Sequence, residues 1–315
     1  MRPASRFTLL ALLCFCAQSC TAGKGGRGEF VGGRDHRRTA DRAAVVITYL
    51  GTNGYLLESG ETRILVDPYF SRLPVTAFAF NQPVEPAAKR IAWALRQLPG
   101  KIDGILVTHG HVDHLLDVPV IARATGALVV ASPTSCFLAQ AAGLAPAATV
   151  PVPPGRTVKI GNTTVRALTA THDRLFGQTL FPGVETAVPP RPVKAADWKM
   201  GEPLAFLIET GGKRIYLDSG GVPGGPLPEI SGPVDLAIVG VALPDARKRL
   251  GPLLGRLRPR CFLPSHQDDF FRPLDDGFRF ALLTDAGGVR RQWVEHGGAP
   301  ERCFLLDYFQ SWVLR

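Results

Sequence analysis

Short runs of apolar, β-prone residues recur along most of this 315-residue chain, separated by turn signals or by amphipathic segments. Apolar runs at 45–50, 54–58 and 62–66 predict three strands near the start of the chain. A break centred on Gly60 separates the last two runs, which we therefore expect to form a β-hairpin.

Amphipathic segments between the strands predict helices. Over 86–98, Ile91 and Leu95 recur at helical spacing, and Pro99 ends the segment. Further strands are expected at 105–107, 127–131, 163–168, 203–209, 213–217 and 235–241, and further helices over 113–126 and 245–257, the last interrupted at Gly251-Pro252. Strands that alternate with helices in this way predict an α/β fold.

One internal repeat supports a division of that fold into two similar halves. Residues 58–67 match residues 209–218 without a gap, and both segments read as strand, turn and strand. The first ends in Asp67 and the second in Asp218, so each half delivers one carboxylate to the end of a strand, where functional loops commonly begin. Any two hairpins resemble each other to some extent, but the matched Arg, Ile and Asp favour pseudo-symmetry.

Candidate metal ligands lie in a histidine-rich run at 108–114, directly after a predicted strand. In extended backbone, residues two apart point to one side, so His109 and His111 can bind one cation, and Gly110 leaves room between them. Where the chain turns into a helix, Asp113 and His114 face a second position. Imidazole and carboxylate ligands suit Zn²⁺, Mn²⁺ or Fe²⁺. A lone histidine pair would be a weak signal, but the whole run argues against a purely structural role.

These features resemble the metallo-β-lactamase superfamily over residues 45–310. The resemblance rests on Tyr49-Leu50-Gly51 through Asp67-Pro68, on the histidine-rich run, and on His172, Asp218 and His266 within the segments 170–173, 216–220 and 263–266. The branch most similar contains ascorbate-6-phosphate lactonase-like proteins and phospholipases D that cleave N-acyl phosphatidylethanolamine. The resemblance implies an αββα sandwich of two pseudo-symmetric halves with metals at one edge.

The same resemblance implies a site with two divalent metal ions. Metal one would be held by His109, His111 and His172, metal two by Asp113, His114 and His266, with Asp218 as the bridge and Asp67 orienting a ligand histidine. Zinc is the metal we expect first, and manganese or iron are alternatives. Two cations about 3.5–4 Å apart can share a hydroxide. Asp113 would hold this hydroxide in line for attack and would later take its proton. Asp67 also has a simpler interpretation, as a turn residue that ends its hairpin.

The expected activity is metal-dependent hydrolysis of an ester, a lactone or a phosphodiester in a small-molecule or lipid substrate. A non-catalytic metal- or ligand-binding lipoprotein on the same fold is the alternative, and the complete ligand set argues against it. Di-iron reductases of this fold typically carry glutamate where His111 stands, and they require a flavin domain for which this chain has no room. The leaving group, the native metal and the oligomeric state stay open.

The start of the chain predicts export. Arg2 and Arg6 precede an apolar run at 7–17, which is shorter than the roughly 20 residues that a membrane span requires. Ala17-Gln18-Ser19-Cys20 resembles a lipobox, although Gln18 is unusual there. Residues 1–19 are therefore expected to be a lipoprotein signal, 20–43 a flexible tether, and 44–315 the hydrolase domain. A lipidated Cys20 would anchor the protein to a bacterial membrane on its periplasmic or cell-surface side, whereas an ordinary secretory signal would leave it free.

Composition and charge change this picture little. The chain is 45% hydrophobic and 20% charged, as is usual for globular proteins. Of the net charge of +9, two arginines in the signal contribute +2 and residues 21–43 contribute +3, which leaves +4 for the body. We therefore expect no nucleic acid partner. Cys136, Cys261 and Cys303 lack metal-ligand spacing and are expected to be buried thiols.

The 30 residues from 173 to 202 follow His172 directly and show little secondary-structure signal. Long irregular loops in compact domains are usually functional or disordered. Large apolar residues and several prolines favour an ordered loop, which we expect to form one wall of the substrate pocket. Its basic residues, Arg174, Arg191, Lys194 and Lys199, are candidates to meet an anionic substrate group. Simple packing over the edge of the sheet is the alternative.

Overall fold

The computed structural model describes residues 31–32 and 44–315, so the proposed signal, Cys20 and most of the tether lie outside the described residues. Within the described part, no helix has both the length and the apolar character that a membrane span requires.

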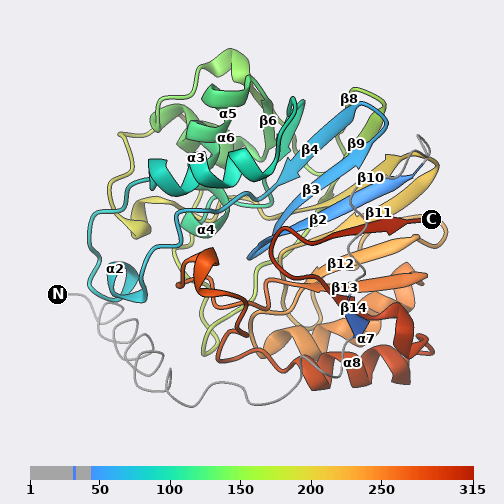
Figure 1. Cartoon of the computed structure of the whole chain (residues 1–315). Coiled ribbons are helices and arrows are strands. Elements are labelled where there is room, and N and C mark those ends of the chain that lie inside the picture. Colours follow the sequence, from blue (N-terminus) through green and yellow to red (C-terminus); the bar gives the residue numbers. More distant parts are fainter. Residues whose placement is uncertain (1–30, 33–43) are drawn as a thin grey trace.

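Two β-sheets pack face to face at the centre of the molecule (Figure 1). The seven-stranded sheet has the order β15-β2-β3-β4-β5-β6-β7, with β2 at Val45–Gly51, β3 at Gly54–Ser59, β4 at Thr62–Val66, β5 at Gly104–Leu106, β6 at Leu128–Ala131, β7 at Thr149–Pro151 and β15 at Ser311–Leu314. The six-stranded sheet has the order β13-β12-β11-β10-β9-β8, with β8 at Thr157–Ile160, β9 at Thr163–Thr169, β10 at Leu204–Thr210, β11 at Lys213–Leu217, β12 at Leu236–Gly240 and β13 at Cys261–Ser265. A short parallel pair joins β1 (Val31–Gly32) to β14 (Phe304–Leu305).

Helices cover the outer face of each sheet and complete an αββα sandwich (Figure 1). The helices on the side of the seven-stranded sheet are α2 (Val75–Ala79), α3 (Ala88–Gln97), α4 (Val112–Leu115), α5 (Val118–Thr125) and α6 (Pro133–Ala141), and those on the other side are α7 (Asp245–Leu257) and α8 (Ala286–Glu295). Single 3₁₀ turns lie at Pro146–Ala148, Ala195–Asp197, Leu274–Asp276 and Pro300–Arg302. The predicted α/β sandwich is confirmed.

The strands are apolar on both faces because each sheet is buried on both faces. Leu57 and Ile64 point into the layer between the sheets, where they belong to the same cluster as Phe206. Their neighbours Leu56 and Leu65 point the other way and pack beneath the helices. Successive side chains of a strand alternate between faces, so a strand covered on both sides reads as a continuous apolar run.

The internal repeat corresponds to two equivalent hairpins, β3–β4 and β10–β11. In the first, Arg63 Nε donates to the Glu58 carboxylate at 2.8 Å; in the second, Arg214 Nε donates to Glu209 at 3.2 Å. The backbone N–H of each arginine also donates to an aspartate carboxylate at 2.9 Å, in the segment that leads into the next parallel strand. The predicted pseudo-symmetry therefore extends to individual hydrogen bonds.

Two predicted helices differ from the structure. The segment 113–126 forms two helices, α4 and α5, because Pro119 has no N–H and cannot continue the hydrogen-bond ladder. The segment 245–257 forms one helix, α7, in spite of Pro252. There the expected interruption was wrong. Gly251 accommodates the close approach of α8, since a Cβ at this position would lie 2.7 Å from His296 Nε2.

All three cysteines of the described body are free and buried, as expected. They are Cys136, Cys261 and Cys303. Burial raises the pKa of the Cys136 and Cys303 thiols to about 12, which keeps both in the protonated form. These residues therefore act as small apolar side chains of the core.

A buried ion pair fixes the loop that follows β13. Arg72 Nη1 and Asp268 Oδ2 are 2.8 Å apart, and neither side chain is exposed to solvent. Tyr308 Oη donates to the same carboxylate oxygen, and the backbone N–H of Thr52 donates to the other, both at 2.8 Å. The carboxylate thus links the β2–β3 turn and the C-terminal segment to the end of β13.

A second buried pair fixes the loop that follows β11. The guanidinium of Arg249, on α7, donates to both oxygens of Asp218 at 2.8 and 3.0 Å. Tyr216 Oη donates to Asp218 Oδ2 at 2.7 Å, and Arg249 also donates to the Gly220 carbonyl at 2.9 Å. Bidentate geometry of this kind binds the loop firmly to α7.

Removing Asp218 tests this structural role directly. In metal-free protein, Asp218→Ala should lower the free energy of unfolding by about 3–5 kcal/mol, because it leaves Arg249 buried without its counter-charge. Denaturant unfolding measures the change. The double variant Asp218→Ala/Arg249→Met should recover part of the loss. Unchanged stability of the metal-free single variant would show that the ion pair does not hold this loop.

Candidate metal centre

The predicted ligands leave the sheets at strand ends that meet at one edge of the sandwich. His109 and His111 follow β5, His172 follows β9, and His266 follows β13 directly. Asp113 and His114 lie on α4, for which His111 is the N-cap residue. Segments that are far apart in the sequence therefore bring their polar side chains together.

The first group consists of His109, His111 and His172, whose ligand atoms lie within 4.8 Å of one another. Nε2 of His109 and Nδ1 of His111 are 2.9 Å apart. Burial lowers the pKa of His111 to about 3 and that of His172 to about 4. Burial and the neighbouring histidines also hold the pKa of His109 well below its usual range. All three rings therefore present neutral nitrogen donors at neutral pH, which is the form that binds a metal ion.

The second group consists of Asp113, His114 and His266, also within 4.8 Å of one another. Asp113 Oδ2 is 3.1 Å from His266 Nε2 and 3.4 Å from His114 Nε2. Burial works against ionisation of Asp113, but the two histidines outweigh it and hold the pKa of this carboxyl well below its usual range. Two imidazoles and one carboxylate form a donor set that fits a divalent cation.

Asp67 lies behind His114 and orients its ring. The Asp67 carboxylate is 2.7 Å from His114 Nδ1, which leaves Nε2 facing Asp113. Asn53 Nδ2 donates to the same carboxylate at 2.8 Å, and Thr108 donates from both its backbone N–H and its hydroxyl. Burial alone would lower the pKa of His114, but Asp113 and Asp67 outweigh it and raise the pKa to about 10, so a metal ion that binds Nε2 would have to displace a proton.

Asp218 lies outside both ligand groups. Both of its oxygens accept hydrogen bonds from Arg249, and Tyr216 donates to one of them. The bridging role that the family resemblance implies for Asp218 stays a prediction. Its neighbour Ser219 does reach the first group, with Oγ 3.4 Å from His109 Nδ1.

Gly110 is required between the first two ligands for a reason that the sequence does not reveal. Its N–H donates to the Met200 carbonyl at 2.9 Å, where the end of the 173–202 loop crosses the histidine-rich segment. A Cβ at this position would lie 2.1 Å from the Lys199 carbonyl oxygen. The glycine therefore permits the loop to close over the site.

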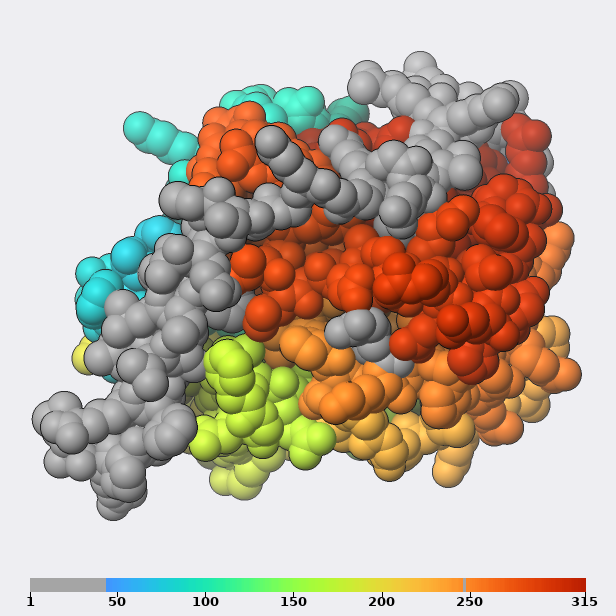
Figure 2. All heavy atoms as spheres, turned by 90° about the horizontal axis from the view of Figure 1, so that it is seen from below, coloured from blue at the N-terminus to red at the C-terminus, as the bar shows by residue number. Residues whose placement is uncertain are grey.

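A cavity of about 120 Å³ opens onto both groups. Its polar lining comes from His111, Asp113, His172, Asp173, Ser219 and His266. Its apolar lining comes from Phe78, Val112, Leu175, Leu180, Phe181, Ala242, Leu243, Phe270 and Phe271. The loop 173–202 therefore contributes a wall beside the ligands, as expected, and in Figure 2 this yellow-green segment meets the orange segments of the last third of the chain.

The basic residues of that loop do not supply the expected anion contact. Arg174 pairs with Asp245 at 3.4 Å, Arg191 with Glu85 at 2.9 Å and Lys199 with Glu185 at 2.6 Å. None of the loop's four basic residues lines the cavity at the ligands. The expectation for these cations was therefore wrong, because acidic side chains nearby already neutralise three of them.

Several residues of the site were not anticipated. Thr108 stands inside the histidine-rich run, and Asp173 directly follows His172, so position alone could have drawn attention to both. Burial raises the pKa of Asp173 to about 7, and Gly221 N donates to it at 2.7 Å. Asn53 and Arg249 reach the site from distant elements, and no local pattern marks them.

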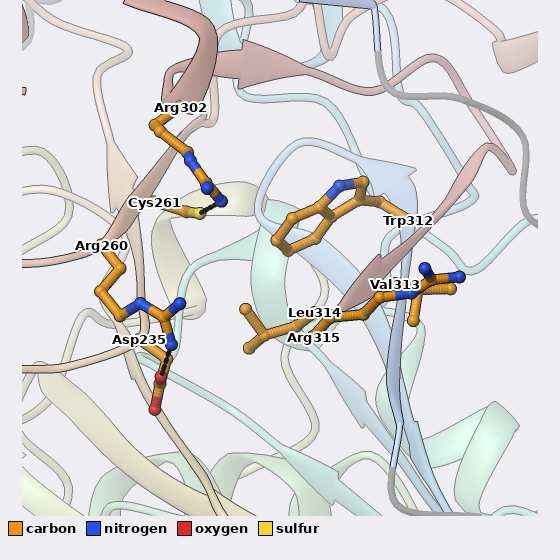
Figure 3. A pocket seen from close by; sticks show the side chains of 8 residues that line it. All are labelled: Asp235, Arg260, Cys261, Arg302, Trp312, Val313, Leu314 and Arg315. Atoms are coloured by element: carbon orange, nitrogen blue, oxygen red, sulfur yellow. Dashed lines mark hydrogen bonds and ion pairs between the residues drawn. The ribbon is translucent and has the colours of Figure 1, made fainter. Parts of the chain in front are cut away.

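Another cavity, of about 250 Å³, lies at the opposite end of β13, between the edges of the two sheets (Figure 3). Its lining consists of Asp235, Arg260, Cys261, Arg302, Trp312, Val313, Leu314 and Arg315. Arg260 pairs with Asp235 at 3.1 Å, and Arg302 donates to the Cys261 sulfur at 3.8 Å. None of the candidate metal ligands lines it.

Comparison with known proteins identifies the family of the chain. A sequence model of the beta-lactamase superfamily domain matches residues 62–266, more than half of the chain. A UPF0173 metal-dependent hydrolase of Thermus thermophilus is 26% identical over 258 residues, which cover 80% of this chain and 97% of that protein. A relative with the same description from Rubrobacter xylanophilus is 31% identical over 176 residues, 54% of this chain and 58% of its own length. The matched region thus spans little more than half of that relative.

The fold comparison gives the same result. The metallo hydrolase Igni18 from the archaeon Ignicoccus hospitalis has a TM-score of 0.57 at 16% sequence identity, with 86% of this chain and 99% of that chain covered. A likeness at this level of identity establishes the fold alone, and the narrower branch expected from the sequence stays a prediction. The match over residues 62–266 establishes the family: the chain belongs to the beta-lactamase superfamily, with the αββα metallo-β-lactamase fold.

Proposed function

We propose that this chain is a dinuclear metal-dependent hydrolase that cleaves an ester, a lactone or a phosphodiester. The observation that carries the proposal is the pair of adjacent three-ligand groups at one cavity. The description of the curated relatives as metal-dependent hydrolases supports the reaction class. A non-catalytic binding protein would have no need to retain both groups with their orienting carboxylate.

His109, His111 and His172 would hold the first metal, and Asp113, His114 and His266 the second. Two divalent cations supply Lewis-acid chemistry: they lower the pKa of water and polarise the oxygen of the scissile group. The first group offers only neutral nitrogens, whereas the second includes a carboxylate. We expect zinc in both positions, with manganese or iron as alternatives, since all three accept nitrogen and oxygen ligands.

The residues of the chain position and protect the reacting groups. Asp113 faces the cavity with a carboxylate that is ionised at neutral pH and can accept a proton from water. Asp67 fixes the ring of His114 through Nδ1. Phe181 and Phe270 add apolar surface to the lining of the cavity, and a less hydrated site strengthens electrostatic interactions within it. Water supplies the hydroxyl group of the acid product and the proton that the leaving oxygen takes up.

Activity assays test the reaction class. Zinc-loaded protein should hydrolyse members of a panel of aryl esters, lactones and aryl phosphodiesters, and removal of metal with a chelator should abolish the activity reversibly. Asp113→Asn should reduce kcat by about 10²–10⁴-fold, in the range of general acid–base groups. The exposed Arg156→Ala variant is the control. A panel without any metal-dependent turnover would contradict the proposal.

Metal content tests the dinuclear arrangement. Elemental analysis of saturated protein should give close to two metal ions per chain, because six terminal ligands are present in two groups. His266→Ala should lower the value toward one, whereas His296→Ala, outside the site, should leave it at two. One metal at saturation, together with unchanged content in His266→Ala, would rule out the second position.

We also propose that Cys20 is lipidated and anchors the protein on the periplasmic or cell-surface side of a bacterial membrane. The short apolar run, the lipobox-like segment and the polar tether of the sequence support this proposal. Cys20→Ser should block maturation or release the protein from membranes, as fractionation and mass spectrometry would detect. An unmodified mature N-terminus beyond residue 20 would exclude lipid attachment at this cysteine.

A further inference from the structure

An aromatic wall leads away from the metal ligands. The ring centroids of His266 and Phe270 are 5.2 Å apart, those of Phe270 and Phe271 are 4.2 Å apart, and those of Phe271 and Phe78 are 5.4 Å apart. Together with Leu180, these side chains give the cavity at the ligands a largely apolar lining. A group that binds there loses water contact over most of its surface, so the lining favours an alkyl or aryl group.

A second cavity at this wall, of about 280 Å³ and separate from the one in Figure 3, adjoins the cavity at the ligands. These two are called the first and the second cavity below. Ala242, Leu243, Phe270 and Phe271 line both cavities. The remaining lining of the second cavity is Pro74, Val75, Asp269, Arg272, Arg279, Phe280, Ala281 and Leu282. The two cavities therefore lie on either side of, or along, the same Phe270–Phe271 wall.

The two arginines of the second cavity differ in their partners. Arg272 is 3.3 Å from Asp269 and 4.0 Å from Asp276, so its charge is largely balanced. Arg279 is exposed, and among the described residues its guanidinium makes no ion pair or hydrogen bond; only its backbone carbonyl is engaged, by the N–H of Asp269. Arg279 thus gives the lining of the second cavity a cation that is free to meet an anion.

We propose that the substrate is an amphipathic ester with an alkyl or aryl group along the Phe270–Phe271 wall and an anionic group at Arg279. This inference names the substrate class for the proposed hydrolase and rests on that function. Arg279, rather than the basic residues of the 173–202 loop, then determines the preference for anionic substrates. Exposed charges attract one another weakly, so the expected preference is moderate and depends on salt.

Binding of linear carboxylates, which resemble the acid products of ester hydrolysis, tests the proposal without requiring turnover. In zinc-loaded protein, one carboxylate of a medium-chain dicarboxylate can lie at the metals and the other at Arg279, whereas a monocarboxylate of equal length lacks the second contact. Isothermal titration at low salt should give the best-fitting dicarboxylate a Kd about two- to fivefold lower than its monocarboxylate partner. The ratio of the monocarboxylate Kd to the dicarboxylate Kd should fall toward one at high salt.

Charge reversal provides the matched variant. Arg279→Glu should reverse the preference, and Arg279→Gln should abolish it. Arg156→Glu is the control, because Arg156 is an equally exposed arginine between β7 and β8 that lines neither cavity. If no chain length gives a preference in the parent protein, or if Arg279→Glu keeps it, the proposal is overturned. If the protein binds the dicarboxylate more tightly than the monocarboxylate but hydrolyses no ester, the subsite at Arg279 is supported and the hydrolase function is contradicted.

Discussion

Five imidazole rings crowd together at one edge of the sandwich, and this crowding is the constraint on which the rest of the site depends. Neighbouring ring centroids are 4.0–5.2 Å apart. Protonated rings at these distances would repel one another, which together with burial favours the neutral form of His109, His111 and His172. A divalent cation held between the neutral nitrogens would take up their lone pairs, which would explain why buried histidines can gather here without acidic partners for each of them.

The ligands lie on irregular backbone beyond the strand ends, so buried carboxylates are needed to fix that backbone. Asp67 and Asp218 end equivalent hairpins of the two halves, yet they act differently. Asp67 orients His114, whereas Asp218 binds Arg249 and secures the loop after β11. Asp268 does the same for the loop after β13 through Arg72. Pseudo-symmetry thus provides two similar positions, and each half has a different partner for its carboxylate.

Much of this arrangement could be predicted from the sequence. Apolar runs identified most strands because both sheets are buried on both faces, and the repeat at 58–67 and 209–218 indicated the two halves. The histidine-rich run identified one part of the site by local spacing. Arg249 could not be anticipated, since its contact with Asp218 spans 31 positions and depends on how α7 packs. The basic residues of the 173–202 loop were wrongly expected to meet a substrate anion. Three of them pair with Glu85, Asp245 or Glu185, and tertiary structure decides these pairs.

The proposed dinuclear centre requires two separate cations side by side, each in its own group of three ligands. Anomalous diffraction at the zinc absorption edge, from crystals of the zinc-loaded protein, tests it most directly. Two peaks are expected, one surrounded by the nitrogens of His109, His111 and His172, the other by Asp113, His114 and His266. A single peak in fully loaded crystals, or peaks outside these two groups, would contradict it.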